Sequence, residues 1–225
     1  MSIRDILREF NISTSSYYLY EQAFSHSSYA HEHGDKHDYE RIEFMGDAVL
    51  DLVVADLVFK NHPNMPQGDM SKLRSKLVKK ESLANYARKY NFGEAILLGN
   101  GEKQNGGKNL DKILEDVFEA FIGAIYLDLG YDMTYSIIKK IFLDDVINYS
   151  SDELTDYKSK LQEYVQADTR DSVKYRLVCE KGNAQSKEFI MEVLWDGNVW
   201  GRGSGSSKKK AEQQAAKDAL SKVAK

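Results

Sequence analysis

The segment Glu40-Arg41-Ile42-Glu43-Phe44-Met45-Gly46-Asp47 places three carboxylates at positions i, i+3 and i+7. Its apolar pattern is that of a helix, so Glu40, Glu43 and Asp47 fall within about 60° of each other around the axis. Acidic side chains beside a buried helix–helix contact repel one another and lose hydration unless a cation compensates their negative charge. Clustered carboxylate oxygens suit Mg²⁺ or Mn²⁺. The apolar residues predicted to face a core on the opposite side are Ile42, Met45, Val49, Leu52 and Val53.

A second acidic pair, Asp116 and Glu119, has i, i+3 spacing in another apolar segment. Small residues accompany both sets of acids, namely Gly46 and Ala48 in the first segment and Ala120 and Gly123 in the second. Small side chains let helices approach closely, so we predict a crossing that brings the two sets together. The acids gathered there would be Glu43, Asp47, Asp116 and Glu119. The alternative is two solvated acidic faces, because such spacings are common on helix surfaces.

Composition limits the class of protein. A chain of 225 residues accommodates one or two domains, and its only cysteine, Cys179, excludes an intramolecular disulfide and a thiolate metal cage. No signal-peptide pattern or membrane-length apolar run is visible, so we expect a cytoplasmic protein that does not associate with membranes. The net charge is −4, yet the last twenty residues hold six lysines against Glu212 and Asp218. This local basic patch is suited to phosphates.

Apolar periodicity predicts an all-α N-terminal domain. The helical segments lie near residues 2–10, 17–30, 39–61, 69–78, 81–90, 109–129 and 132–147. Turn-forming residues interrupt them at 61–68 and at 99–107. A short polar stretch follows the last helix. We therefore expect a first domain over residues 1–148, a linker over 149–155 and a second domain over 156–225.

The C-terminal part has the pattern of a small α+β domain with the order α-β-β-β-α. We predict a helix over 156–167, strands over 173–180, 189–195 and 198–203, and a helix over 208–223. Asp196-Gly197 is typical of a two-residue hairpin turn. Ser206-Ser207 supplies an N-cap for the last helix.

These motifs carry a family resemblance. Residues 40–50 closely resemble the signature of the ribonuclease III endonuclease domain, and Asp116-x-x-Glu119-Ala120-x-x-Gly123 is similar to that family's second acidic motif. Further segments that fall where the family has comparable ones are Ser25-His26-x-Ser28-Tyr29, Gly68-Asp69-x-Ser71-x-Leu73-Arg74 and Gly106-Gly107-Lys108. The C-terminal part resembles a double-stranded RNA-binding domain. The resemblance covers nearly the whole chain, and the compact layout looks like the bacterial enzyme.

The resemblance implies an Mg²⁺-dependent homodimer, in which Mn²⁺ can substitute, that hydrolyses both strands of double-stranded RNA to 5′-phosphate and 3′-hydroxyl ends. Processing of rRNA and mRNA is the expected role. The implied metal ligands are Glu43, Asp47, Asp116 and Glu119, and the implied catalytic residues are Asp47, Glu119 and Glu40. The chemistry agrees, because a phosphodiester must have its charge neutralised while water attacks in line. The alternative is a dimeric double-stranded RNA-binding protein that does not cleave.

The second domain offers candidate RNA contacts. Lys208, Lys209 and Lys210 begin the last helix, where they oppose the helix macrodipole, a local cost that phosphate binding would relieve. The resemblance adds Gln162 and Gln185. Gln185 lies in a loop where many relatives carry Pro and His, but its amide can still donate to a 2′-hydroxyl.

Phe44 lies only about 40° from Glu40 in a helical projection and away from the apolar stripe. Either it packs under a loop of its own subunit or, as the resemblance implies, it enters a pocket of a second copy and forms the dimer interface.

Gln67 replaces the usual family glutamate and brings no charge. Four of the five histidines lie between His26 and His37, where a polar loop is favoured over a zinc site.

Overall fold

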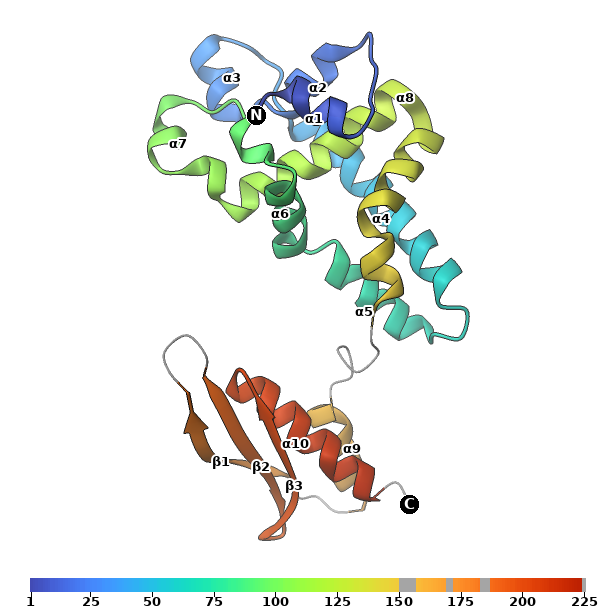
Figure 1. Ribbon diagram of the computed structural model, residues 1–225, viewed down its shortest axis with the longest axis vertical. Helices are drawn as coiled ribbons and strands as arrows, with labels where there is room; N and C mark the ends of the chain where they lie inside the picture. Colours follow the sequence, from blue (N-terminus) through green and yellow to red (C-terminus); the bar gives the residue numbers. More distant parts are fainter. Residues whose placement is uncertain (150–156, 169–171, 183–186, 224–225) are drawn as a thin grey trace. The chain divides into compact units, whose positions relative to one another are not determined.

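The computed structural model describes residues 1–149, 157–168, 172–182 and 187–223. The chain forms two compact units, residues 1–154 and 155–225 (Figure 1). Most of the predicted linker lies outside the described residues. Within those residues, no helix combines the length and the apolar character needed to cross a membrane.

The first unit is built from helices, as predicted. Its α-helices are α1 (Ile3–Glu9), α2 (Tyr17–Ala23), α3 (Ser27–His33), α4 (Glu40–Asn61), α5 (Gln67–Leu77), α6 (Lys80–Lys89), α7 (Asn100–Gln104) and α8 (Asp111–Ile147). Two short 3-10 helices, η1 (Phe92–Glu94) and η2 (Gly107–Asn109), complete the helical elements of its described part. The stretch 99–107, expected as an interruption, therefore contains a short helix.

The single helix predicted over 17–30 is wrong, because the chain breaks it into α2 and α3. Ser25 forms an isolated bridge with Leu97. The His26 amide donates to the Leu97 carbonyl (3.0 Å), and the Leu97 amide donates to the Phe24 carbonyl (2.8 Å). The His26 ring then accepts from the amide of Ser28 (3.1 Å) and caps α3. A pairing with a distant segment, rather than a local turn signal, ends the first helix.

Helices α4 and α8 cross in close contact (Figure 1), and glycines lie at the crossing. A Cβ atom on Gly46 would lie 1.8 Å from the carbonyl oxygen of Glu119, and one on Gly123 would lie 2.3 Å from that of Ile42. The crossing through these small residues is thus confirmed, although Ala48 is exposed and takes no part in it. α8 kinks at Gly130, whose φ is 76°, where the sequence separates two predicted helices.

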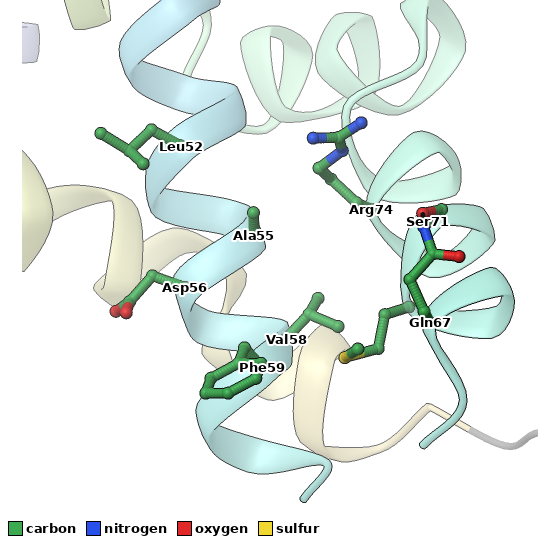
Figure 2. A pocket seen from close by; sticks show the side chains of 9 residues that line it. Leu52, Ala55, Asp56, Val58, Phe59, Gln67, Ser71 and Arg74 are labelled. Atoms are coloured by element: carbon green, nitrogen blue, oxygen red, sulfur yellow. Dashed lines mark hydrogen bonds between the residues drawn. The ribbon is translucent and has the colours of Figure 1, made fainter.

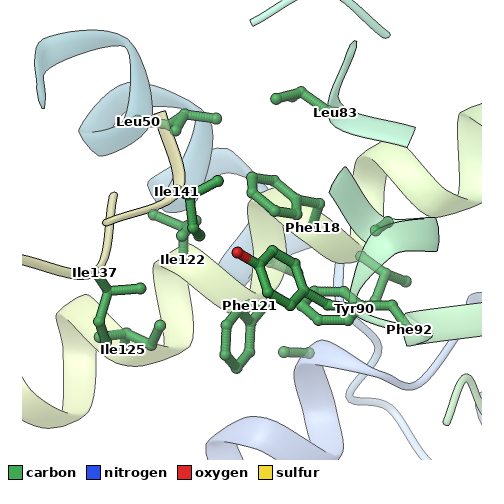
Figure 3. Close-up of a cluster of buried hydrophobic side chains, with 14 of the residues drawn as sticks. Leu50, Leu83, Tyr90, Phe92, Phe118, Phe121, Ile122, Ile125, Ile137 and Ile141 are labelled. Carbon is green, nitrogen blue, oxygen red and sulfur yellow. The ribbon is translucent and has the colours of Figure 1, made fainter. Parts of the chain in front are cut away.

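Aromatic and aliphatic side chains fill the core around this crossing (Figure 3). The ring centroids of Phe92 and Phe121 lie 5.0 Å apart, and Phe118 stacks on Phe92 at 5.9 Å. Of the predicted core residues of α4, Ile42, Val49 and Val53 are buried and Met45 is half-buried. The prediction was wrong for Leu52, which is 58% exposed, because its side of α4 opens onto a pocket beside α5.

The second unit has the predicted α-β-β-β-α order, with α9 (Tyr157–Asp168), β1 (Lys174–Lys181), β2 (Glu188–Trp195), β3 (Asn198–Gly205) and α10 (Lys208–Val223). Its three strands form an antiparallel sheet in the order β1-β2-β3. Asp196 and Gly197 both have positive φ, as the predicted hairpin turn requires. On β3, alternate glycines face α10, and a Cβ on Gly203 would lie 2.2 Å from the amide of Ala215.

Candidate active site

The acidic side chains of α4 and α8 line a depression of about 470 Å³ beside the helix crossing. Glu40, Glu43 and Asp47 project from one face of α4, and Asp116 and Glu119 project from one face of α8. The full lining is Tyr39, Glu40, Glu43, Phe44, Asp47, Lys112, Asp116 and Glu119. The two acidic segments predicted from the sequence therefore meet at one site.

Three of the acids form a tight group. Glu43, Asp116 and Glu119 each place a carboxylate oxygen within 4.8 Å of the others. Asp116 and Glu119 are buried, whereas Glu43 is half-buried. Asp47 and Glu40 lie in the same depression, but both are exposed and outside this group of three.

Burial and mutual repulsion change the acidity of this group. Burial, followed by the charge of Asp47, raises the pKa of Glu119 to about 8. Burial, followed by the charge of Asp116, raises the pKa of Glu43 to about 7. Two carboxyl groups that resist ionisation near neutral pH indicate that the negative charges of the depression outweigh the positive charge of Lys112.

Asp116 is held by two residues that the sequence analysis did not identify. The Tyr39 hydroxyl donates to its Oδ2 atom (3.2 Å), and the Lys112 ammonium donates to its Oδ1 atom (2.5 Å). Burial, with the charge of Asp116, raises the pKa of Tyr39, so this phenol stays protonated as a donor. Tyr39 directly precedes Glu40, and Lys112 precedes Asp116 by one helical turn.

Two family profiles match the chain, one described as Ribonuclease-III-like over residues 17–146 and one described as double-stranded RNA binding motif over residues 157–223. The chain belongs to the ribonuclease III family. Ribonuclease 3 from Bacillus cytotoxicus is 42% identical over 224 residues, which cover 99% of this chain and 91% of the relative. Ribonuclease 3 from Bacillus cereus is 45% identical over 204 residues, which cover 90% of this chain and 83% of the relative.

Solved structures agree with this membership. Two structures of the ribonuclease III nuclease domain from Campylobacter jejuni are each 34% identical to this ribonuclease III family member, with TM-scores of 0.61 and 0.60. They cover 66% and 65% of the chain, and the match spans 100% and 97% of their own lengths. The enzyme class that follows is an endoribonuclease specific for double-stranded RNA.

The second unit of this ribonuclease III family member presents the predicted basic cluster. Lys208, Lys209 and Lys210 are exposed in the first turn of α10. Ser207 caps this helix as predicted, since its Oγ atom accepts from the amide of Lys210 (3.3 Å). The Gln162 side chain accepts from the amide of Val173 (3.2 Å) and so ties α9 to the segment before β1. Gln185 lies outside the described residues.

Other candidates from the sequence take separate positions. Phe44 is 75% exposed at the edge of the acidic depression, so the core of its own unit does not explain it. The Gln67 amide donates to Ser71 on α5 (3.2 Å), away from the acids of the depression. The polar loop predicted between His26 and His37 is wrong for three of its histidines, because His26 caps α3 and His31 and His33 lie within that helix.

Proposed function

We propose that this family member hydrolyses both strands of double-stranded RNA in a reaction that depends on Mg²⁺, for which Mn²⁺ can substitute. The products carry 5′-phosphate and 3′-hydroxyl ends. The observation that carries the proposal is the group of Glu43, Asp116 and Glu119 at the α4–α8 crossing, within the matched nuclease segment. We propose processing of rRNA and mRNA in the cytoplasm as its role.

The donor set fits a hard divalent cation. The potential ligands grouped at the site are carboxylate oxygens, and such oxygens are the ligands that Mg²⁺ and Mn²⁺ prefer. The proposed metal ligands are Glu43, Asp47, Asp116 and Glu119. When bound, the metal would neutralise the scissile phosphate and activate water. The raised pKa values of Glu43 and Glu119 support the fit, because they reflect buried acids whose mutual repulsion a divalent cation would relieve.

Asp47, Glu119 and Glu40 are the proposed catalytic residues, and their positions suggest different tasks. Glu119 is buried where the depression meets the α4–α8 crossing, so we place its carboxylate at the floor of the depression. Asp47 and Glu40 are exposed at the rim, where an incoming RNA backbone would meet them. We propose that the rim acids orient the attacking water and the floor acids hold positive charge against the phosphate.

We propose that two copies pair through Phe44. An apolar pocket of about 330 Å³ lies between α4 and α5 (Figure 2). Leu52 and Phe59 line it and are 58% and 68% exposed. Such a pocket suits an aromatic ring of a second copy, and a two-fold axis would use the contact twice. The Campylobacter jejuni nuclease domain is described as having a region involved in dimer formation, which supports pairing here.

The second domain is proposed to hold the duplex. Lys208, Lys209 and Lys210 would contact phosphates at the start of α10, and Gln162 and Gln185 would contact the minor groove. A protein that only binds RNA is the alternative. It is less favoured, because the complete acidic set would then serve no purpose.

Incubation of the full chain with a long RNA duplex tests this proposal. Cleavage should occur with Mg²⁺ and disappear in excess chelator, while single-stranded RNA of the same sequence should remain intact. The variant Glu119→Ala should bind the duplex with nearly unchanged affinity but cleave it orders of magnitude more slowly in single-turnover reactions. Full activity in chelator, or a normal rate for this variant, would contradict the proposal.

A further inference from the structure

Lys112 inserts a positive charge into the group of acids. Its Nζ atom lies 2.5 Å from Asp116, 3.7 Å from Glu115 and 3.9 Å from Glu43. The Lys112 side chain is 65% exposed, whereas the Asp116 side chain is only 7% exposed. A lysine on the surface of α8 thus extends its ammonium from solvent onto a buried carboxylate.

The two oxygens of Asp116 are engaged in different ways. Tyr39, which is itself buried, donates to Oδ2, and Lys112 donates to Oδ1. A hydroxyl is neutral and can remain bonded to a carboxylate that also binds a metal ion. An ammonium cannot share the carboxylate in this way, because it would repel a divalent cation a few ångströms away.

We propose that Lys112 is a built-in competing cation. It pairs with Asp116 and offsets part of the charge of Glu43 while the site holds no metal, and it must leave before a divalent cation binds. The inference rests on the proposed function, since the metal site belongs to that proposal. Lys112 would therefore set the metal concentration that the enzyme needs. It would also prevent the uncompensated acids from destabilising the metal-free protein.

The structure makes the exchange easy. The exposed stem of Lys112 can turn outward into solvent without disturbing the core. Its ion pairs to Glu115 and Glu43 are long, so each contributes little when it breaks. The helix positions of Asp116 and Glu115 relative to Lys112, i+4 and i+3, keep the ammonium close enough to return when the metal leaves.

Calorimetric titration of the RNA-free full chain with Mn²⁺ and Mg²⁺ tests the competition. The variant Lys112→Met removes the charge but keeps an unbranched side chain, and it should bind the metal about three- to tenfold more tightly. Lys112→Arg keeps a cation and should bind within about twofold of the wild type. Lys108→Met is the matched control, because Lys108 pairs with Glu94 outside the depression, and it should also leave affinity unchanged.

Thermal unfolding of the same variants gives a readout independent of cleavage. In excess chelator, Lys112→Met should unfold at a lower temperature than the wild type, because the acids lose their counter-ion. In saturating Mn²⁺ that difference should vanish. A purely structural ion pair would instead produce the same loss in both conditions and would overturn the inference.

The titration separates the two proposals. If the wild type binds metal and Lys112→Met binds it equally or more weakly, the competing-cation role is wrong and the metal site stands. If neither protein binds Mn²⁺ or Mg²⁺, the proposed metal site itself fails, and the role of Lys112 fails with it.

Discussion

The carboxyl groups of Glu43 and Glu119 have pKa values raised from 4.5 to about 7 and about 8. Between pH 4.5 and these raised pKa values, the folded protein binds more protons than the unfolded chain. Rising pH should therefore lower the stability of the metal-free protein. Glu119→Gln removes one of these titrations. In chelator, the wild-type melting temperature should therefore fall relative to that of the variant between about pH 5 and about pH 8.5.

The test measures the melting temperatures of the wild type and of Glu119→Gln across this pH range in the same buffers. The difference between wild type and variant cancels most other titrating groups, because these are shared. A difference that does not change with pH would show that the Glu119 carboxyl has an ordinary pKa.

The spacing of the acids predicted that the acidic residues of α4 and α8 lie together. It did not predict the residues that contact Asp116. Glu40, Glu43 and Asp47 share a helix face whatever the tertiary structure, so the sequence was sufficient to predict that they lie side by side. The role of Tyr39 depends on where α8 lies, which no local pattern reveals. The i, i+4 spacing of Lys112 and Asp116 was visible, but such a pair is usually a solvated surface contact.

At the scale of the elements, the α4–α8 crossing depends on Gly46. A Cβ there would lie 1.8 Å from the carbonyl oxygen of Glu119, so Gly46→Ala must push the helices apart. We expect a loss of about 1–3 kcal/mol or more in the free energy of unfolding, measured in denaturant. Cleavage should also fall, because Glu43 and Glu119 would separate.

Gly101→Ala is the control for this prediction. Nothing lies within 4 Å of its Cβ position, and Gly101 is in α7, where alanine is the better helix former. Its stability should be unchanged or slightly increased. Equal stability of Gly46→Ala and the wild type would mean that the helices tolerate a wider crossing.

A charged ladder crosses the sheet of the second unit. Glu192 on β2 is buried and pairs with Arg176 on β1 and Arg202 on β3, each at 2.7 Å. These hydrogen bonds lower the pKa of Glu192, so its stabilising effect should be lost as pH falls below about 4.5. Glu192→Ala leaves two like charges facing each other and should unfold this unit at a lower denaturant concentration.

Tryptophan fluorescence can follow that unfolding selectively, because the chain has two tryptophans, Trp195 and Trp200, and both lie in the second unit. Glu188→Ala, an exposed position on the same strand, is the control and should leave the midpoint unchanged. An unchanged midpoint for Glu192→Ala would show that the ladder adds nothing to stability.

Helices and strands were predictable where one pattern dominates. The long apolar stripes of α4 and α8 and the Asp196-Gly197 hairpin followed from periodicity and turn chemistry. The break between α2 and α3 did not, because it depends on pairing of Ser25 with Leu97, more than seventy residues later. Leu52 was misassigned because periodicity cannot tell a core from an apolar pocket open to solvent.

At the scale of the whole molecule, RNA binding should depend on salt through the lysines of α10. Replacing Lys208 and Lys209 with alanine should weaken binding to all duplex sequences alike and reduce the salt slope by about two. Lys222→Ala is the control, because Lys222 pairs with Asp218 at the other end of the helix (2.6 Å). Titrations of labelled duplexes at several salt concentrations measure both quantities. An unchanged slope would place the phosphate contacts elsewhere.

The proposed cleavage of both strands of a duplex raises a question of symmetry. Among the described residues of the chain, one group of three potential metal ligands is found, and it lies in the acidic depression. Two antiparallel strands can be cut in one binding event by two sites related by a two-fold axis, and the proposed pairing of two copies would supply them. Phe44 is the candidate anchor, since it is 75% exposed beside the acids and an apolar pocket opens between α4 and α5. A buried aromatic anchor typically contributes about 2 kcal/mol or more, and the symmetry would use it twice.

Phe44→Ala should therefore shift the protein toward monomer and lower duplex cleavage, while its helical content stays the same. Sedimentation over a dilution series compares wild type and variant, and circular dichroism checks the fold. Tyr18→Ala is the matched control, because Tyr18 is 65% exposed on α2 and lines neither the acidic depression nor the α4–α5 pocket. It should remain as dimeric as the wild type. A wild type that is monomeric at every concentration, or a Phe44 variant that stays dimeric, would rule out this anchor and would require the second strand to be cut in a separate binding event.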